Sequence, residues 1–197
     1  MIFLNFKIYP ETSGENTLKL CRLIKDKRVI PCLQAVDIVR VKQVLPDLEI
    51  WGQYADPVGL AAANGVLLNH CEHQLNFDQI KATVVKCRES KLRVMIITDS
   101  LELIKQVNEF KPDYIGFEDP QLIGGPVAMI DAHFDLVQQA AAAAGTVPLI
   151  VGGGIRTTEH VKKSLQAGGQ GVLVASELAK SPNPAATLAD LLLGLDS

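Results

Sequence analysis

The chain has 197 residues, of which 48% are hydrophobic and 21% are charged, and its formal net charge is −3. This is the balance of an ordinary globular protein of one-domain length, and because Lys and Arg are scattered we expect no nucleic-acid partner. No apolar run is long enough to span a bilayer and no signal peptide opens the chain, so the sequence predicts a soluble, cytoplasmic protein without membrane contact.

Eight short, β-rich apolar segments recur along the chain. In order they are Ile2–Lys7, Arg28–Leu33, Leu48–Gln53, Gly65–Asn69, Arg93–Thr98, Tyr114–Phe117, Pro148–Val151 and Gly171–Val174. Segments with helical periodicity lie between most of them and after the last, at Glu15–Asp26, Val36–Leu45, Phe77–Ser90, Leu101–Phe110, Asp131–Ala144, Thr158–Ala167 and Pro184–Leu193. Alternation of strand and helix predicts an all-parallel sheet, and eight such strands are the number that close into a barrel.

The connection after the third predicted strand is unusually short. A parallel crossover needs roughly a dozen residues, so residues 54–64 can return the chain but without a proper helix. The sequence therefore predicts one domain over residues 1–197, a closed eight-stranded parallel β/α barrel whose third helix is missing or vestigial. An open doubly wound sheet uses the same alternation, but no G-x-G-x-x-G follows an early strand and so short a chain leaves nothing for a second layer.

The end of the first predicted strand carries two polar residues. Barrel enzymes keep their chemistry at the carboxyl ends of the strands, so these positions matter most. Strand parity puts Asn5 and Lys7 on the same face as Phe3, and we expect both to point into the barrel mouth. Taken alone, Lys7 is as readily a solvated lysine at a strand end.

The fourth and sixth predicted strands end on titratable residues. Parity places His70 on the face of Val66 and Leu68, and we expect it to reach the same mouth. Glu118 has inward parity at the end of the sixth strand. A partly desolvated carboxylate there can have a raised pKa and act as a base.

The last quarter of the chain combines glycines with small residues at two strand ends. Gly152, Gly153 and Gly154 follow the seventh strand, and Ala175 and Ser176 follow the eighth. Such residues free backbone N–H groups to hold a phosphate dianion. The pattern predicts a phosphate-bearing ligand and says nothing about the reaction.

Five fragments occur at these strand ends in a recognisable order. They are Asn5-Phe6-Lys7, Asn69-His70-Cys71-Glu72, Phe117–Gly125, Gly152–Ile155 and Gly171–Ser176. Together they resemble the triosephosphate isomerases, particularly the short archaeal-type members, over nearly the whole chain except the third connection. The resemblance implies a TIM barrel and a glycolytic and gluconeogenic isomerase that interconverts dihydroxyacetone phosphate and glyceraldehyde 3-phosphate through an enediolate. It implies no cofactor and no metal.

The resemblance also implies a role for each matched residue. Lys7 would be the cation near substrate oxygens, Asn5 its positioner, His70 the electrophile and Glu118 the base, with Gln121–Gly125 as a mobile lid. A neutral His70, its pKa lowered by a following helix N-terminus, would polarise the carbonyl, an arrangement for which this family is the standard example. The implied phosphate cradle is the backbone of Gly124, Gly153, Gly154, Ala175 and Ser176.

Several positions depart from the family pattern. In the family, the loop after the third strand is a long arm that reaches into the neighbouring subunit, and residues 54–64 lack it, so we expect a monomer or a non-standard homo-oligomer. Asp119 follows the base where proline is usual, and Gly125-Pro126 shortens the lid tip. Glu177 replaces a small residue, and a carboxylate beside the phosphate would weaken binding unless its side chain turns away.

Three other functions remain open at this point. His70-Cys71-Glu72-His73 offers three kinds of metal ligand, although the spacing is poor for one centre. Lys7 could form a Schiff base in a phosphate-binding aldolase. A non-catalytic phosphosugar-binding barrel would keep the cradle without turnover. Separately, Glu118 could be a purely structural carboxylate, buried and paired with Lys7 only.

Overall fold

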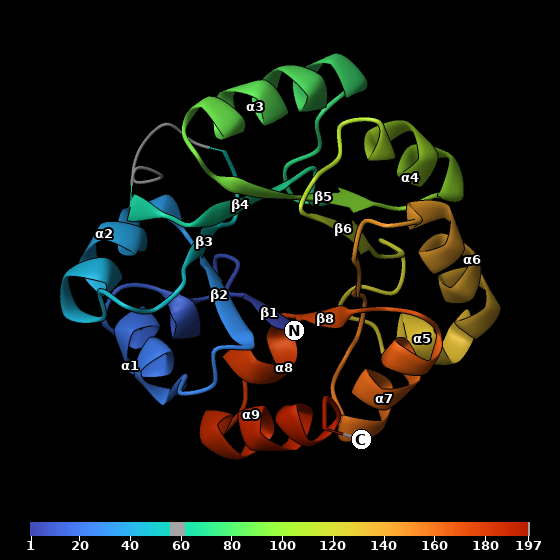
Figure 1. The fold of residues 1–197 in the computed structure, drawn as a ribbon. Helices are drawn as coiled ribbons and strands as arrows, with labels where there is room; N and C mark the ends of the chain where they lie inside the picture. The colour runs from blue at the N-terminus through green and yellow to red at the C-terminus, as the bar shows by residue number, and fades with distance from the viewer. Residues whose placement is uncertain (56–61, 197) are drawn as a thin grey trace.

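A computed structural model of the chain describes residues 1–55 and 62–196 and contains a closed parallel barrel (Figure 1). Each strand pairs in parallel with the next, and the last pairs back onto the first. The strands are β1 (Ile2–Asn5), β2 (Val29–Leu33), β3 (Trp51–Gly52), β4 (Gly65–Leu68), β5 (Arg93–Thr98), β6 (Tyr114–Phe117), β7 (Leu149–Val151) and β8 (Gly171–Val174). The predicted eight-stranded β/α barrel is therefore confirmed.

Helices surround this barrel as an outer ring (Figure 1). They are η1 (Pro10–Thr12), α1 (Glu15–Leu23), α2 (Ala35–Val44), α3 (Phe77–Glu89), α4 (Leu101–Asn108), α5 (Met129–Ala132), α6 (Phe134–Ala144), α7 (Thr158–Gln166), α8 (Ser176–Ala179) and α9 (Pro184–Leu193). Within the described ranges, no helix is long and apolar enough to cross a membrane.

The helix prediction needs two corrections. The segment predicted as one helix, Asp131–Ala144, is two helices, because His133 has φ −137° and ψ 46°, outside the helical region, and separates α5 from α6. The short helices η1 and α8 were not predicted, since three and four residues are too few to show a helical period. The predicted loss of the third helix depends on residues 56–61, which lie outside the described residues.

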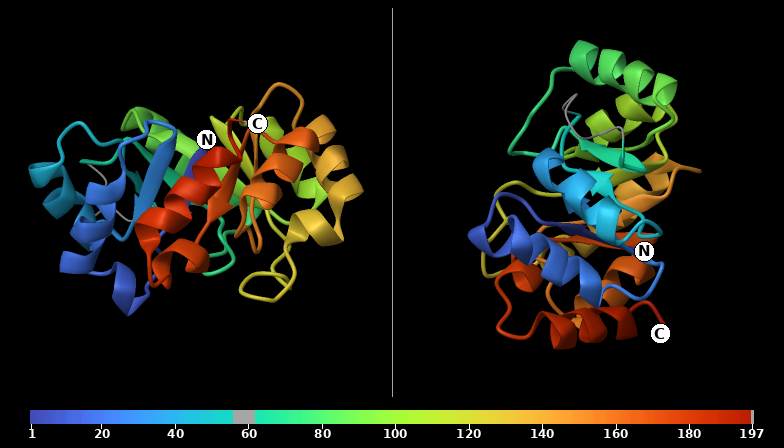
Figure 2. Two further views of the ribbon diagram at one scale, coloured as in Figure 1. Left: turned by 90° about the horizontal axis from the view of Figure 1, so that it is seen from below. Right: turned by 90° about the vertical axis from the view of Figure 1, so that its left-hand side faces the viewer.

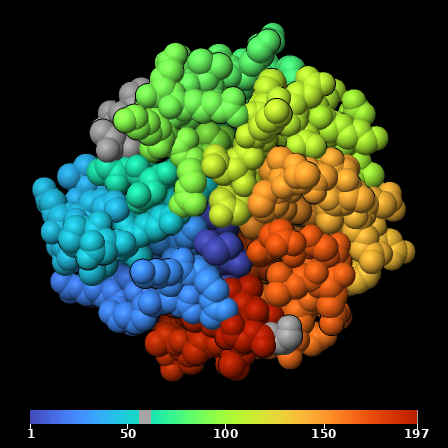
Figure 3. Space-filling model, in the orientation of Figure 1, coloured from blue at the N-terminus to red at the C-terminus, as the bar shows by residue number. Residues whose placement is uncertain are grey.

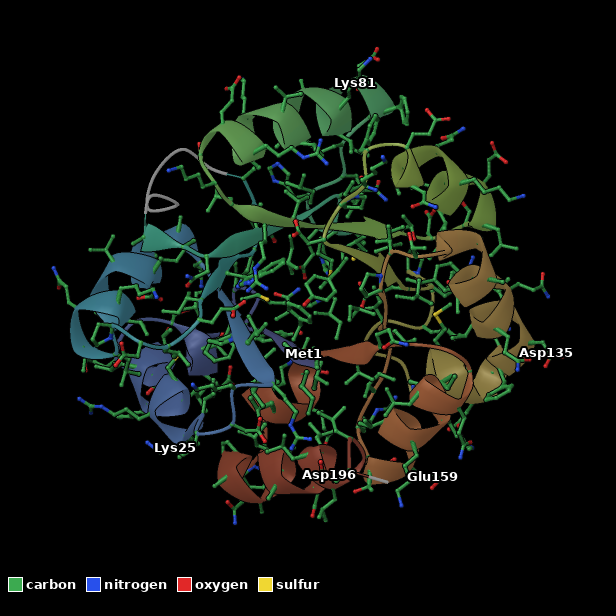
Figure 4. All side chains as sticks on the ribbon, viewed as in Figure 1. Met1, Lys25, Lys81, Asp135, Glu159 and Asp196 are labelled. Atoms are coloured by element: carbon green, nitrogen blue, oxygen red, sulfur yellow. The ribbon has the colours of Figure 1, made fainter. Side chains whose placement is uncertain are left out.

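Strand alternation divides the core into two layers. Ile2, Leu4 and Phe6 belong to the outer layer, between the barrel and its helices, whereas Phe3 belongs to the inner layer. Side chains fill the centre of the barrel (Figure 4). The inner layer is Phe3, Ile30, Cys32, Trp51, Leu67, Met95, Ile97, Ile150 and Leu173.

Aromatic packing closes the amino-terminal end of this interior. The ring of Phe3 lies 5.1 Å from those of Trp51 and Tyr114, edge to face. Gly65 makes room for the indole, since a Cβ there would lie 2.4 Å from the Trp51 ring. Met1 is labelled near the centre of this face (Figure 4), and the space-filling view from the same side shows the centre filled by the dark blue N-terminal end of the chain (Figure 3). An open site therefore belongs at the other end, where the connection between β6 and α5 protrudes away from both termini (Figure 2, left).

Candidate active site

A cavity of about 260 Å³ opens at the carboxyl ends of the strands. All nine residues predicted for the site line it, namely Asn5, Lys7, His70, Glu118, Gly124, Gly153, Gly154, Ala175 and Ser176. Six further residues complete the lining: Tyr9, Ile123, Gly125, Ile155, Arg156 and Leu173. Residues that were predicted independently at five strand ends therefore line one cavity.

Lys7 owes its position to two polar neighbours. β1 ends at Asn5, and Lys7 itself has φ 49°, a left-handed conformation that a non-glycine residue keeps only under constraint. The backbone N–H of Lys7 donates to Asn5 Oδ1 at 3.1 Å, and Gln53 Nε2 donates to the Lys7 carbonyl at 2.9 Å. The buried ammonium then meets Glu72 Oε1 at 3.1 Å. The cation is thus held at the cavity wall, already paired with a carboxylate.

His70 reaches the cavity for a different reason from the one predicted. Val66 and Leu68 belong to the outer core layer, so strand parity alone would turn His70 away from the mouth. The strand ends at Leu68, and Asn69 has φ 61°, which redirects the chain. The Asn69 side chain stabilises this turn: its Nδ2 donates to the Ile97 carbonyl at 2.9 Å, and its Oδ1 accepts from the backbone N–H of Leu75 at 2.9 Å. The parity argument was wrong, although His70 does line the cavity.

The hydrogen bonds of the imidazole assign its tautomer. The backbone N–H of Glu72 donates to His70 Nδ1 at 3.3 Å, so Nδ1 accepts and the proton of a neutral ring is on Nε2. Burial, together with the smaller effect of the nearby Lys7 ammonium, lowers the pKa of His70 to about 4. The expected cause of the lowered pKa, the N-terminus of a following helix, is wrong, because the next α-helix, α3, begins only at Phe77. Near neutral pH, His70 is an uncharged hydrogen-bond donor.

Glu118 presents one free carboxylate oxygen to the cavity. Its Oε1 accepts from the Gly153 N–H at 3.2 Å, whereas Oε2 is buried without a hydrogen-bond partner, 3.5 Å from His70 Nε2. Burial raises the pKa of Glu118 to about 7, against the opposing effect of Lys7. Gly152 is needed here, because a Cβ at this position would lie 2.3 Å from Oε1. A carboxylate in this environment is suited to exchange protons near neutral pH.

Three glycines with positive φ also line the cavity. Gly124, Gly153 and Gly154 have φ of 72°, 82° and 78°, values that L side chains rarely adopt. No Cβ covers the backbone at Gly124 and Gly154, as an anion site requires, whereas the Gly153 N–H already donates to Glu118 Oε1. Ala175 and Ser176 border the same space at the start of α8, whereas Glu177 does not line it. The arrangement can accommodate a phosphate group.

The residues considered for a metal site do not converge. The ring of His73 stacks on Tyr54, with centroids 4.8 Å apart, while His70 faces Glu118. Within residues 1–55 and 62–196, no group of three or more His, Cys, Asp or Glu side chains is arranged to hold a metal ion.

Arg156 and Tyr9 are the polar lining residues that the sequence interpretation missed. A signal for each was present, since a basic residue follows the glycine run closely and an aromatic residue follows Lys7 closely. Neither residue lies at a strand end, where barrel enzymes keep their chemistry, so strand ends alone do not point to them.

Comparisons with known proteins bear on this site. Residues 77–193 match the family model described as histidine biosynthesis protein. The chain is 30% identical to a triosephosphate isomerase of Thermoplasma volcanium, over 97% of this chain and 98% of the relative. It is 28% identical to one of Methanobrevibacter smithii, over 98% and 97%.

Solved structures show how widely the fold is shared. The chain is similar to a 3-hexulose-6-phosphate synthase from Salmonella typhimurium, with a TM-score of 0.77 at 16% identity over 98% of this chain and 97% of that one. It is also similar to a triosephosphate isomerase from Bartonella henselae, with a TM-score of 0.70 at 18% identity over 97% and 98%. At such identities, these likenesses show the fold alone.

The fold and the cavity define a parallel β/α-barrel protein with a carboxylate, a neutral imidazole and an ammonium in one cavity that glycines also line. The chain belongs to the triosephosphate isomerase family by its full-length relatives and, over residues 77–193, to the histidine biosynthesis protein family.

Proposed function

We propose that this protein is a triosephosphate isomerase, which interconverts dihydroxyacetone phosphate and glyceraldehyde 3-phosphate without a cofactor. One observation carries the proposal. Glu118 Oε2, a buried carboxylate oxygen with no hydrogen-bond partner, lies 3.5 Å from His70 Nε2 in the cavity that the glycines line. A base and an uncharged donor on one small cavity suit proton transfer next to a carbonyl group.

The residues divide the work of such a reaction between them. Glu118 Oε2 would remove a proton from the hydroxyl-bearing carbon beside the substrate carbonyl and return it to the former carbonyl carbon. His70 would donate a hydrogen bond from Nε2 to oxygens on the same two carbons. The Lys7 ammonium would stabilise the enediolate charge, and preorganised charge acts more strongly in a site shielded from water than in bulk solvent. The atoms balance, since the product differs from the substrate only in the positions of hydrogens.

The dimensions of the cavity support a small substrate. Pockets for drug-sized ligands measure about 300–1,000 Å³, and this one is about 260 Å³. The glycines that suit a phosphate group lie on the same wall as Glu118, since Gly153 donates its N–H to that carboxylate. A ligand that places its phosphate at the glycines therefore needs only a short carbon chain to reach the base.

The competing functions have weaker support. A Schiff-base aldolase needs a lysine amine free to attack the substrate carbonyl, whereas Lys7 Nζ already pairs with Glu72 Oε1 at 3.1 Å. The histidine biosynthesis model spans residues 77–193, which include Glu118 but neither Lys7 nor His70. The full-length relatives cover all three positions, so they weigh more in choosing the reaction.

Steady-state isomerisation of glyceraldehyde 3-phosphate, measured for the parent protein beside Glu118→Gln, tests the proposal. We expect turnover by the parent and a loss on the order of a thousandfold or more in kcat for the variant, because the amide cannot accept the proton. Glu89→Gln, an exposed carboxylate at the end of α3, serves as the matched control and should leave kcat unchanged.

Each alternative function predicts a different outcome of the same preparation. A parent protein that binds inorganic phosphate but catalyses no isomerisation would be a phosphosugar-binding barrel. Covalent trapping of a keto-phosphate on Lys7 by borohydride would instead identify an aldolase.

A further inference from the structure

Arg156 connects the loop after β7 to the loop that lies over the cavity. Its Nη2 donates to the Gly125 carbonyl at 2.6 Å, and its Nη1 donates to the Pro126 carbonyl at 2.9 Å. Both acceptors belong to residues 119–127, which we call the cover loop and which lie between β6 and α5. The planar fork of the guanidinium thus spans two successive carbonyls of one turn.

The cover loop has few other polar connections to the barrel. Its remaining hydrogen bonds are internal, such as Leu122 N–H to the Asp119 carbonyl at 3.0 Å and Gly125 N–H to the Leu122 carbonyl at 3.1 Å. Within the described ranges, two hydrogen bonds join residues 120–127 to other parts of the chain, and both come from Arg156. At the start of the cover loop, Asp119 Oδ2 lies 3.8 Å from His133 Nε2. Arg156 therefore supplies the hydrogen bonds that connect residues 120–127 to the rest of the barrel.

Arg156 is itself held firmly. Its backbone N–H donates to His160 Nδ1 at 3.2 Å, and His160 Nε2 lies 3.0 Å from Asp131 Oδ2. Asp131 Oδ1 accepts from Lys163 Nζ at 2.7 Å, so the network links the start of α7 to α5. An arginine anchored on its own side can position a loop that has little polar support.

The cover loop touches the glycines of the anion site. A Cβ at Gly154 would lie 3.0 Å from the Val127 carbonyl and 3.1 Å from Arg156 Nη2. Gly124, in the middle of the cover loop, and Arg156 line the same cavity. Moving the cover loop would therefore change where its backbone meets a ligand at these glycines.

We propose that Arg156 is a positioning residue that fastens the cover loop over the cavity, so that the backbone at Gly124 meets the substrate phosphate. This inference rests on the proposed function for its substrate but not for the loop contact. A lysine keeps the charge of Arg156 but cannot bridge two carbonyls with a planar fork. The comparison of Arg156→Lys with Arg156→Ala therefore separates fastening from charge.

The experiment measures kcat and KM for glyceraldehyde 3-phosphate, together with the rate of thermolysin cleavage inside residues 119–127, located by mass spectrometry. For Arg156→Ala we expect KM to rise by a factor on the order of ten or more and the cover loop to be cleaved faster, with Arg156→Lys close to the alanine variant. Arg22→Ala, on the exposed side of α1, is the control for loss of an arginine and should match the parent. Unchanged urea midpoints confirm that any effect is local.

Three results would overturn the inference. Parent-like KM and cleavage in Arg156→Ala would show that Arg156 fastens nothing. Full rescue by Arg156→Lys would show that only the charge matters. A raised KM with unchanged cleavage would make Arg156 a direct phosphate ligand. If the parent protein does not isomerise the substrate, the proposed function fails while the cleavage comparison still tests the loop contact.

Discussion

The buried base should make the protein less stable than it would be with a neutral side chain at position 118. Burial raises the pKa of Glu118 from 4.5 to about 7, so the folded chain prefers the protonated form. The destabilisation is absent below about pH 4.5, grows as the pH rises and is complete above about pH 7. One pKa unit corresponds to about 1.4 kcal/mol, so ionised Glu118 costs the folded chain about 3 kcal/mol at pH 8.

Glu118→Gln removes this titration while keeping the shape of the side chain. The amide brings a penalty of its own, about 1 kcal/mol for a buried donor without a partner. That penalty does not depend on pH, so the informative quantity is how the stability difference between variant and parent changes with pH. We expect this difference to shift by about 2 to 3 kcal/mol in favour of the variant between pH 5 and pH 8.

Urea unfolding monitored by circular dichroism measures this difference. The free energies of unfolding of the parent and of Glu118→Gln are compared at pH 5 and pH 8, and groups that titrate equally in both proteins cancel. The control Glu89→Gln should show no such dependence, since this carboxylate is exposed. A variant whose advantage over the parent is the same at both pH values would refute the reasoning, because Glu118 would then have an ordinary pKa.

Four further predictions follow from the same geometry. The value of kcat/KM, which reports the pKa values of the free enzyme, should fall below about pH 7 as Glu118 is protonated, and it should show no second loss until His70 becomes charged near pH 4. A kcat/KM that is constant from pH 5 to pH 8 would contradict this. Gly152→Ala should lower kcat by a factor on the order of a hundred, because the new methyl group displaces Glu118, and a parent-like kcat would show that the carboxylate adapts. Asn69→Ala should reduce kcat more than it reduces stability, because alanine disfavours the left-handed backbone conformation that directs His70 into the cavity. If Asn69→Gly restores kcat, the backbone conformation matters and the hydrogen bonds of the Asn69 side chain do not. Light scattering over a concentration series should give a monomer or a dimer built on another surface, whereas a dimer interlocked through residues 54–64 would refute the expectation.

The pattern of elements could be predicted from the sequence because it depends on local properties. Each strand is a short apolar run, and each helix between strands repeats its apolar residues with a helical period, so their order implies parallel crossovers and closure. Glu118 could be placed in the mouth for the same reason, because β6 is regular up to Phe117 and parity carries over to the next residue.

Parity failed where the backbone stopped being extended. Val66 and Leu68 face outward, yet His70 lines the cavity because Asn69 takes a left-handed conformation that no alternation rule includes. The break at His133 inside a predicted helix has the same origin, since its backbone leaves the helical region within an otherwise continuous apolar pattern.

The sequence by itself determined the barrel, the order of its elements and the residue types gathered at the strand ends, because these follow from neighbours along the chain. Only the tertiary structure decided the tautomer and the pKa of His70, the free oxygen of Glu118 and the hold of Arg156 on the cover loop. The tautomer depends on the backbone fold between His70 and Glu72, and the other properties arise between residues far apart in sequence. Burial by several strands sets a pKa, and the distance between two loops sets a hydrogen bond, and neither quantity is encoded in any single segment.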